Sequence, residues 1–210
     1  MSDPSRDSDA ARLRVFAGEL DDMAYREMAK RLRANDQASA LLFGRDIDEL
    51  AVRLASAGVC VVVDAAGEPS ARPEPDRLRR MTLTPEGLAA SAEAPFDLVL
   101  GRLALHSRPY AEAREVLRQL RALLKIGGKL YLSAYGLHST LGDHYADSER
   151  LVQERYAELP AELAELYDLR GPVCLYSERN LIMLLFEVGM PVMQSSTDAV
   201  GNVRAVAVRI

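Results

Sequence analysis

One stretch of the chain, residues 39–64, changes its hydrophobic period within a few positions. The apolar run 41–43 stops at Gly44, and apolar residues then recur every three or four positions from 47 to 55. The first pattern is typical of a buried strand and the second of an amphipathic helix. The stretch therefore predicts a strand, a tight turn and a helix, which is the first half of a βαβ unit.

The second half of the unit follows directly. Gly58 stands where a helix ends with a left-handed residue, and the all-apolar run 59–63 is typical of a parallel strand covered on both faces. Asp64 ends this run, about twenty residues after Gly44. An acidic side chain at this point holds a ribose diol in dinucleotide-type folds. Asp64 is therefore a candidate cofactor ligand.

Two later segments add to this pattern. One is FDLVLG at 96–101, and the other is VLRQLRALLKIGGKLYLSAY at 116–135, in which we expect a helix with Lys125 in its last turn, a Gly127-Gly128 stop and a strand. Together with 39–64 they resemble class I S-adenosylmethionine (SAM) dependent methyltransferases, over roughly 38–210. The resemblance implies an α/β, Rossmann-like, doubly wound fold with a seven-stranded, mostly parallel sheet and an antiparallel last strand.

The resemblance also implies a cofactor and a site at the carboxyl ends of the strands. Gly44 would approach the methionine part of SAM, and Asp64 would hold the ribose. Residues near Thr84 and Leu103 would frame the adenine. We expect no metal, because His138, Asp143 and His144 do not have the spacing of a zinc site and are better explained as loop residues.

Three residues are candidates for the chemistry of methyl transfer, which needs mainly alignment of acceptor and sulfonium. Arg102 lies near the expected cleft and would orient an anionic acceptor. His106 or Tyr135 would accept the proton of the acceptor. Each of the three has a structural alternative, as a lining or surface residue.

The cofactor loop departs from the pattern of the resembled family. Its sequence, Gly44-Arg45-Asp46-Ile47-Asp48, keeps the first glycine of GxGxG and has aspartates in place of the second and third. Side chains there reduce the room for a cofactor, and their charge opposes its carboxylate. Both aspartates also stand where N-cap and first-turn acids stabilise a helix, by about 0.5–2 kcal/mol for a good cap. We favour this capping role for both.

The resemblance and this departure from it leave two functions open. The first is a SAM-dependent methyltransferase acting on a small molecule or a protein. The second is a catalytically inactive relative that serves as a scaffold or as a regulatory subunit of a partner. A nicotinamide enzyme is less consistent with the sequence, because neither GxGxxG nor Tyr-x-x-x-Lys is present. We expect weak or absent SAM binding.

Composition restricts the partners and the compartment. There are 31 acidic and 26 basic residues, so the net charge of −5 argues against binding to nucleic acid. Cys60 and Cys174 form neither a disulfide framework nor a metal cluster. The polar N-terminus and the lack of an apolar run of about eighteen residues predict a cytoplasmic protein without a membrane span. A protein partner or a homodimer remains open.

The domain organisation is simple. We expect a flexible tail at 1–10 and one domain at 11–210, which begins with a helix at 11–34. A helical lid inserted at about 135–173 would contain helices at 146–158 and 161–167. The remaining expectations are an irregular, proline-rich crossover at 67–80, a third strand at 79–84, a turn or short helix at 85–94, and a final hairpin of 191–197 and 204–210.

Overall fold

The computed structural model describes residues 4–35, 37–64, 74–82, 84 and 95–210, with the backbone alone for 4–17. Seven strands form one sheet in the order β3-β2-β1-β4-β5-β7-β6. The neighbours from β3 to β5 are parallel, whereas β7 is antiparallel to both β5 and β6. The strands are β1 (Ser39–Gly44), β2 (Cys60–Asp64), β3 (Leu78–Met81), β4 (Phe96–Arg102), β5 (Leu124–Ala134), β6 (Val192–Thr197) and β7 (Val203–Val208).

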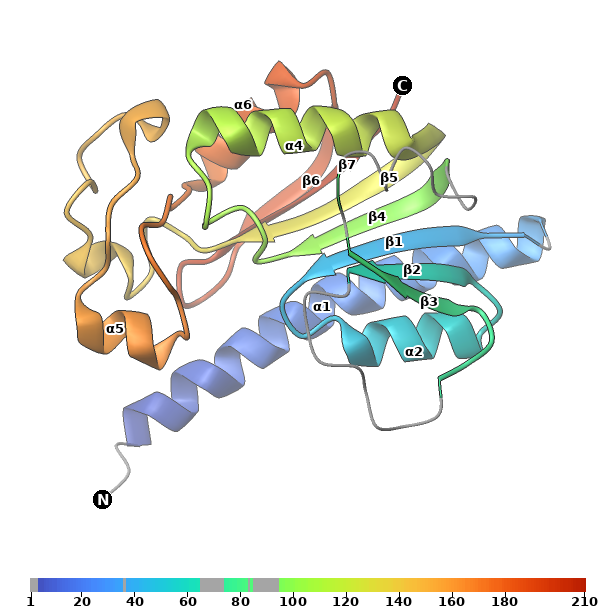
Figure 1. The fold of residues 1–210 in the computed structure, drawn as a ribbon, viewed down its shortest axis with the longest axis horizontal. Helices are drawn as coiled ribbons and strands as arrows, with labels where there is room; N and C mark the ends of the chain where they lie inside the picture. The colour runs from blue at the N-terminus through green and yellow to red at the C-terminus, as the bar shows by residue number, and fades with distance from the viewer. Residues whose placement is uncertain (1–3, 36, 65–73, 83, 85–94) are drawn as a thin grey trace.

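Helices cover both faces of the sheet, as Figure 1 shows, with α1 and α2 on one face and α4 and α6 on the other. This three-layer arrangement is the predicted α/β fold, and the antiparallel last strand is confirmed. The helices are α1 (Pro4–Ala34), α2 (Asp48–Ser56), α4 (Tyr110–Leu123), α5 (Ala161–Leu166) and α6 (Glu178–Glu187), with single 3-10 turns η1 (Gly142–His144) and η2 (Val152–Glu154).

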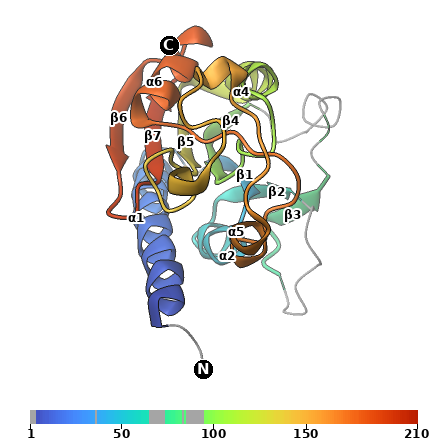
Figure 2. The same ribbon diagram turned by 90° about the vertical axis from the view of Figure 1, so that its left-hand side faces the viewer.

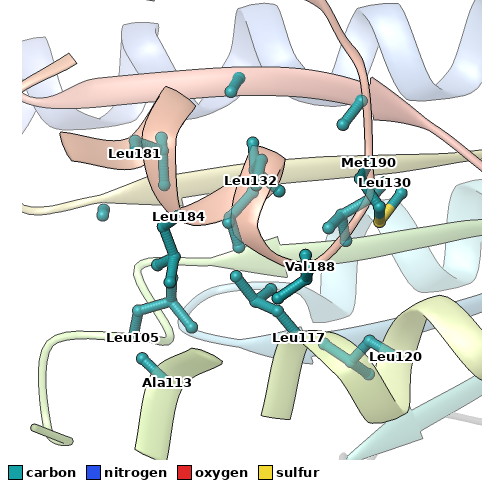
Figure 3. Close-up of a cluster of buried hydrophobic side chains, with 14 of the residues drawn as sticks. Leu105, Ala113, Leu117, Leu120, Leu130, Leu132, Leu181, Leu184, Val188 and Met190 are labelled. Carbon is teal, nitrogen blue, oxygen red and sulfur yellow. The ribbon is translucent and has the colours of Figure 1, made fainter. Parts of the chain in front are cut away.

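The core has two main layers because successive strand residues point to opposite faces of the sheet. In β1, Leu41 and Phe43 pack in the layer under α4 and α6, and Ala40 and Leu42 pack in the layer under α1 and α2. Figure 3 shows the first layer, where leucines of α4 and α6 meet on β5. Nine core residues expected from the periodicity are all buried: Leu42, Leu54, Val61, Val63, Leu98, Leu100, Leu120, Leu130 and Leu132.

Several element boundaries differ from those expected. Helix α1 begins at Pro4, so residues 4–10 belong to the helix and do not precede it. Strand β3 is Leu78–Met81, shorter than expected at its carboxyl end. Residues 65–73 and 85–94, where we expected most of the irregular crossover and a turn or short helix, lie outside the described residues.

The junction of α4 and β5 was also predicted wrongly. We expected Lys125 in the last helical turn and Gly127-Gly128 as the stop, but Leu124 is already extended and begins β5. A buried charge explains the early end of the helix. The Nζ atom of Lys125 lies 2.7 Å from the Asp97 carboxylate, which also accepts the N–H of Ser39. An ion pair to β4 therefore draws this segment into the sheet.

The insertion between β5 and α6 contains less helix than predicted. Residues 161–166 are helical as expected, but the helix expected at 146–158 is only the turn η2. Arg155 is buried there and donates to the carbonyl groups of Arg150, at 2.7 Å, and Leu175, at 2.9 Å. Carbonyls bound to a buried guanidinium are not available to a helix, so tertiary contacts override the local helical pattern.

Candidate functional site

The candidate residues come together at the carboxyl ends of the parallel strands. Gly44, Asp64 and Arg102 are the last residues of β1, β2 and β4, and Tyr135 directly follows β5. Because these strands are parallel, their carboxyl ends lie on the same side of the molecule. The strand order reverses between β1 and β4, where open α/β sheets bind ligands. Figure 1 shows the insertion beyond these strand ends.

Gly44 is required by a close contact between two strands. Its φ is +99°, and a Cβ atom there would lie 2.1 Å from the carbonyl oxygen of Arg102. The same oxygen accepts the N–H of Arg45 at 2.9 Å. The glycine therefore allows the loop to turn directly against β4. This need of the fold exists whether or not a cofactor binds.

The two aspartates of the loop have different roles. The N-cap of α2 is Ile47 and has no side-chain cap, so the capping role expected for Asp46 is wrong. Asp48 is a first-turn acid, as expected, and its carboxylate lies 2.8 Å from the Arg80 guanidinium of β3. Asp46 has a φ of +51°, in the left-handed region where Asp is tolerated better than most side chains. It therefore keeps a conformation that glycine would adopt easily.

Arg102 is buried and is bound within the protein. The residue is 4% exposed, and its guanidinium donates to the Asp21 carboxylate of α1 and to the backbone carbonyl of Asp46. Burial raises the pKa of Asp21, more than the neighbouring guanidinium lowers it. Arg102 thus connects α1, β4 and the cofactor loop, and its role of orienting an anionic acceptor stays a prediction.

Arg45 is the residue of the site that the sequence did not reveal. Its Nη1 atom lies 2.7 Å from the carbonyl oxygen of Tyr167, 3.1 Å from that of Asp168 and 3.5 Å from the Tyr135 hydroxyl. Its Nη2 atom lies 3.3 Å from the Asp168 carboxylate. Tyr135 directly follows β5, and β4 separates β1 from β5. The side chains of Arg45 and Tyr135 thus link the end of β1 to the end of β5, beside the point where the strand order reverses.

His106 and two tyrosines form an aromatic cluster beside Arg45. The rings of His106 and Tyr135 meet edge to face with centroids 4.9 Å apart, and Tyr135 meets Tyr167 in the same way at 6.1 Å. Burial, and then the charge of Arg45, lowers the pKa of His106 to about 4. The imidazole is therefore neutral at pH 7, and its low basicity makes it a poor general base there. Its Nδ1 atom is buried without a partner among the described residues.

The expected cofactor ligands differ in their surroundings. Asp64 is half-buried at the end of β2, opposite Met81 of β3. Leu103 has a φ of +47° and donates its N–H to the Ser133 hydroxyl at 3.1 Å. Thr84 is exposed beyond β3. Asp64 and Gly44 lie at the ends of adjacent strands, as a SAM site requires, but their roles toward a cofactor stay predictions.

Other expectations concern metals and membranes. Within the described ranges, no group of three or more His, Cys, Asp or Glu side chains is arranged to hold a metal ion. His138, Asp143 and His144 are exposed at the start of the insertion. In the same part of the chain, no helix combines the length and the apolar character that crossing a bilayer takes.

The fold matches known structures, although no protein-family model and no curated protein matches the chain by sequence. A SAM-dependent methyltransferase from Methanosarcina mazei is 17% identical, with a TM-score of 0.58 over 83% of this chain and 93% of that one. Magnesium protoporphyrin IX methyltransferase from Synechocystis PCC 6803, with bound SAH, is 18% identical, with a TM-score of 0.55 over 95% and 86%.

A third similar structure covers the whole chain. It is 1,6-didemethyltoxoflavin-N1-methyltransferase from Burkholderia thailandensis, with bound 1,6-didemethyltoxoflavin and S-adenosylhomocysteine, at 17% identity and a TM-score of 0.59 over 100% of this chain and 91% of that one. At these identities the likeness concerns the fold. The chain has the class I SAM-dependent methyltransferase fold, as the segments 39–64, 96–101 and 116–135 predicted.

Proposed function

We propose that this protein is a non-catalytic member of the methyltransferase fold that acts as a scaffold or regulatory subunit for another protein. One observation carries the proposal. Arg45, the second residue of the cofactor loop, follows β1 directly and is bound to Tyr167, Asp168 and Tyr135. These contacts hold an arginine side chain at the carboxyl end of β1, beside the point where open α/β sheets bind their ligands.

The energy of this contact supports weak cofactor binding. A hydrogen bond to a charged group contributes about 1.5–3 kcal/mol, less where solvent reaches it. Arg45 is bound to three residues and its side chain is 31% exposed, so moving it aside costs about 1–2 kcal/mol. A cofactor that must displace Arg45 would lose affinity by about ten- to thirtyfold.

The loop itself also fits SAM only in part. Gly44 and Asp64 lie at the ends of adjacent strands. Burial, and to a lesser extent the charge of Asp46, raises the pKa of Tyr135. The Asp46 carboxylate would likewise oppose the carboxylate of a cofactor bound at this loop. The carbonyl group of Asp46 is already bound to Arg102.

A second candidate function is SAM-dependent methyl transfer. It is favoured by Gly44 and Asp64 at the ends of adjacent strands, and by neighbours of the same fold whose structures contain SAH. In this case Asp64 would hold the ribose, and Thr84 and Leu103 would lie beside the adenine. Residue Arg45 would have to leave its present contacts before SAM could enter.

Calorimetric titration with SAM and with its demethylated product separates the two functions. We expect no binding by the native protein, and measurable binding by the Arg45→Ala/Asp46→Gly variant if the loop side chains are the obstacle. The control is Arg53→Ala, an exposed arginine of α2 that pairs with Asp22. Micromolar binding by the native protein, lost in Asp64→Ala, would refute the non-catalytic function and establish the second candidate.

A further inference from the structure

The two edges of the sheet differ in charge. Strand β3, at one edge, has the sequence LRRM and carries Arg79 and Arg80. Strand β6, at the other edge, has the sequence VMQSST and no charged residue over its six positions. Natural sheets commonly protect an edge with charged side chains, because unpaired N–H and C=O groups there attract another strand. Strand β6 has no such charge, but its register against β7 shifts between Val192 and Gln194, so residues 194–197 are its regular part.

The surface beside β6 is apolar at several exposed positions. In the strand, Met193 is 60% exposed. On α6, which packs beside β6, Met183 is 48% exposed and Phe186 is 56% exposed. Figure 2 shows β6 as the outermost strand, with α6 above it. Exposed apolar side chains beside an uncharged edge are typical of a contact surface.

Strand β6 is also held in an extended form before any partner arrives. The Glu178 carboxylate, in the first turn of α6, accepts hydrogen bonds from the Ser195 hydroxyl at 2.6 Å and the Thr197 hydroxyl at 3.1 Å. On the other side of the strand, the Ser196 hydroxyl accepts from the Arg204 guanidinium at 2.7 Å. A preorganised edge needs little further ordering to pair, so the cost of association is reduced.

We propose that β6 pairs antiparallel with β6 of a second copy of this chain, which joins the two sheets across a two-fold axis. The absence of charge in β6 favours this occupant, because self-pairing brings each residue against the same short sequence and no like charges meet. Main-chain hydrogen bonds supply the affinity, as in strand addition to a sheet edge. The contact lies at the opposite edge of the sheet from β3 and does not depend on SAM binding.

Analytical ultracentrifugation tests this contact with a pair of matched variants. The Met193→Lys/Gln194→Lys variant adds two charges at exposed positions of β6. The control, Val52→Lys/Ile126→Lys, adds the same charge at exposed apolar positions outside β6. Circular dichroism of both variants verifies that they are folded.

We expect the native protein and the control to sediment at twice the mass of the chain. The β6 variant should sediment as a monomer, with a dimer dissociation constant raised about a hundredfold or more by the charges brought together. Amide exchange in residues 192–197 should become slower as the concentration of the native protein is raised. A native protein that is monomeric, or a dimer that the β6 variant leaves intact, would overturn the proposal, including the case in which β6 receives a strand of another protein.

Discussion

The Arg45 guanidinium lies 2.7 Å from the carbonyl oxygen of Tyr167, a residue 122 positions further along the chain. Tyr167 is the C-cap of α5, and Asp168, which also binds Arg45, has a φ of +48°. The cofactor loop thus fixes the end of the only α-helix within the described insertion. This contact links the state of the loop to the position of the insertion.

Replacing Arg45 should therefore loosen the insertion. In Arg45→Ala we expect faster amide exchange in residues 161–169, and a loss of about 1–2 kcal/mol of unfolding free energy, because hydrogen bonds to a partly exposed guanidinium are removed. Exchange measured by mass spectrometry reports the first effect, and urea unfolding reports the second. Arg118→Ala, which removes an exposed pair with Glu115, is the control. Unchanged exchange in 161–169 would show that Arg45 does not hold the insertion.

Two glycines with nearly the same φ should respond differently to alanine. Gly44 and Gly58 have φ values of +99° and +102°. An added Cβ atom has nothing within 4 Å at Gly58, but it would lie 2.1 Å from the Arg102 carbonyl oxygen at Gly44. Gly58→Ala should cost only backbone strain, about 1–2 kcal/mol. Gly44→Ala should cost at least about 2 kcal/mol more, because β1 must separate from β4.

Urea unfolding of the two alanine variants, measured side by side, provides the comparison. The m-values should agree with that of the native protein, so that the midpoints report stability. Equal losses would mean that the contact between the loop and β4 relaxes without cost.

The two loop aspartates should also differ when each is changed to glycine. In Asp46→Gly, relief of the left-handed backbone is offset by the greater entropy of the unfolded chain, so we expect a change within about 0.5 kcal/mol of zero. In Asp48→Gly, loss of helix propensity and of the pair with Arg80 should cost about 1–1.5 kcal/mol. Thermal and urea unfolding measure both changes. A larger loss in Asp46→Gly than in Asp48→Gly would contradict these assignments.

The sheet could be predicted from the sequence because its signals are local. Apolar runs such as 61–63 and 98–100 are buried on both faces, and Gly58 has the positive φ that its position after a helix predicted. The final hairpin that the sequence predicted is formed by β6 and β7. Each of these features depends on residues within a few positions of one another.

The candidate site could be predicted only in part, because its contacts join distant segments. Gly44, Asp64 and Tyr135 lie together at the carboxyl ends of the strands, as the order of the motifs implies. The role of Arg45 could not be predicted, because its partners lie in the insertion and hydrophobic periodicity does not indicate the path of that segment. The buried contacts of Arg155, which replace an expected helix, were hidden for the same reason.

The pH dependence of stability should carry a contribution from His106. Burial lowers the pKa of this imidazole from 6.5 to about 4, so between these values the unfolded chain binds more protons than the folded protein. The contribution is complete above pH 6.5 and is lost as the pH falls toward 4. The full shift amounts to about 3 kcal/mol, from 1.36 kcal/mol per pKa unit, and most of it is lost by pH 4.

The variant His106→Gln isolates this contribution from the acidic groups that titrate over the same range. We expect the stability difference between native protein and variant, from urea unfolding at a series of pH values, to shift against the native protein by about 2–3 kcal/mol between pH 7 and pH 4. His144→Gln removes an exposed imidazole and serves as the control. A difference for His106→Gln that stays constant with pH, together with an imidazole that titrates near pH 6.5 by NMR, would show that Arg45 and burial do not keep His106 neutral.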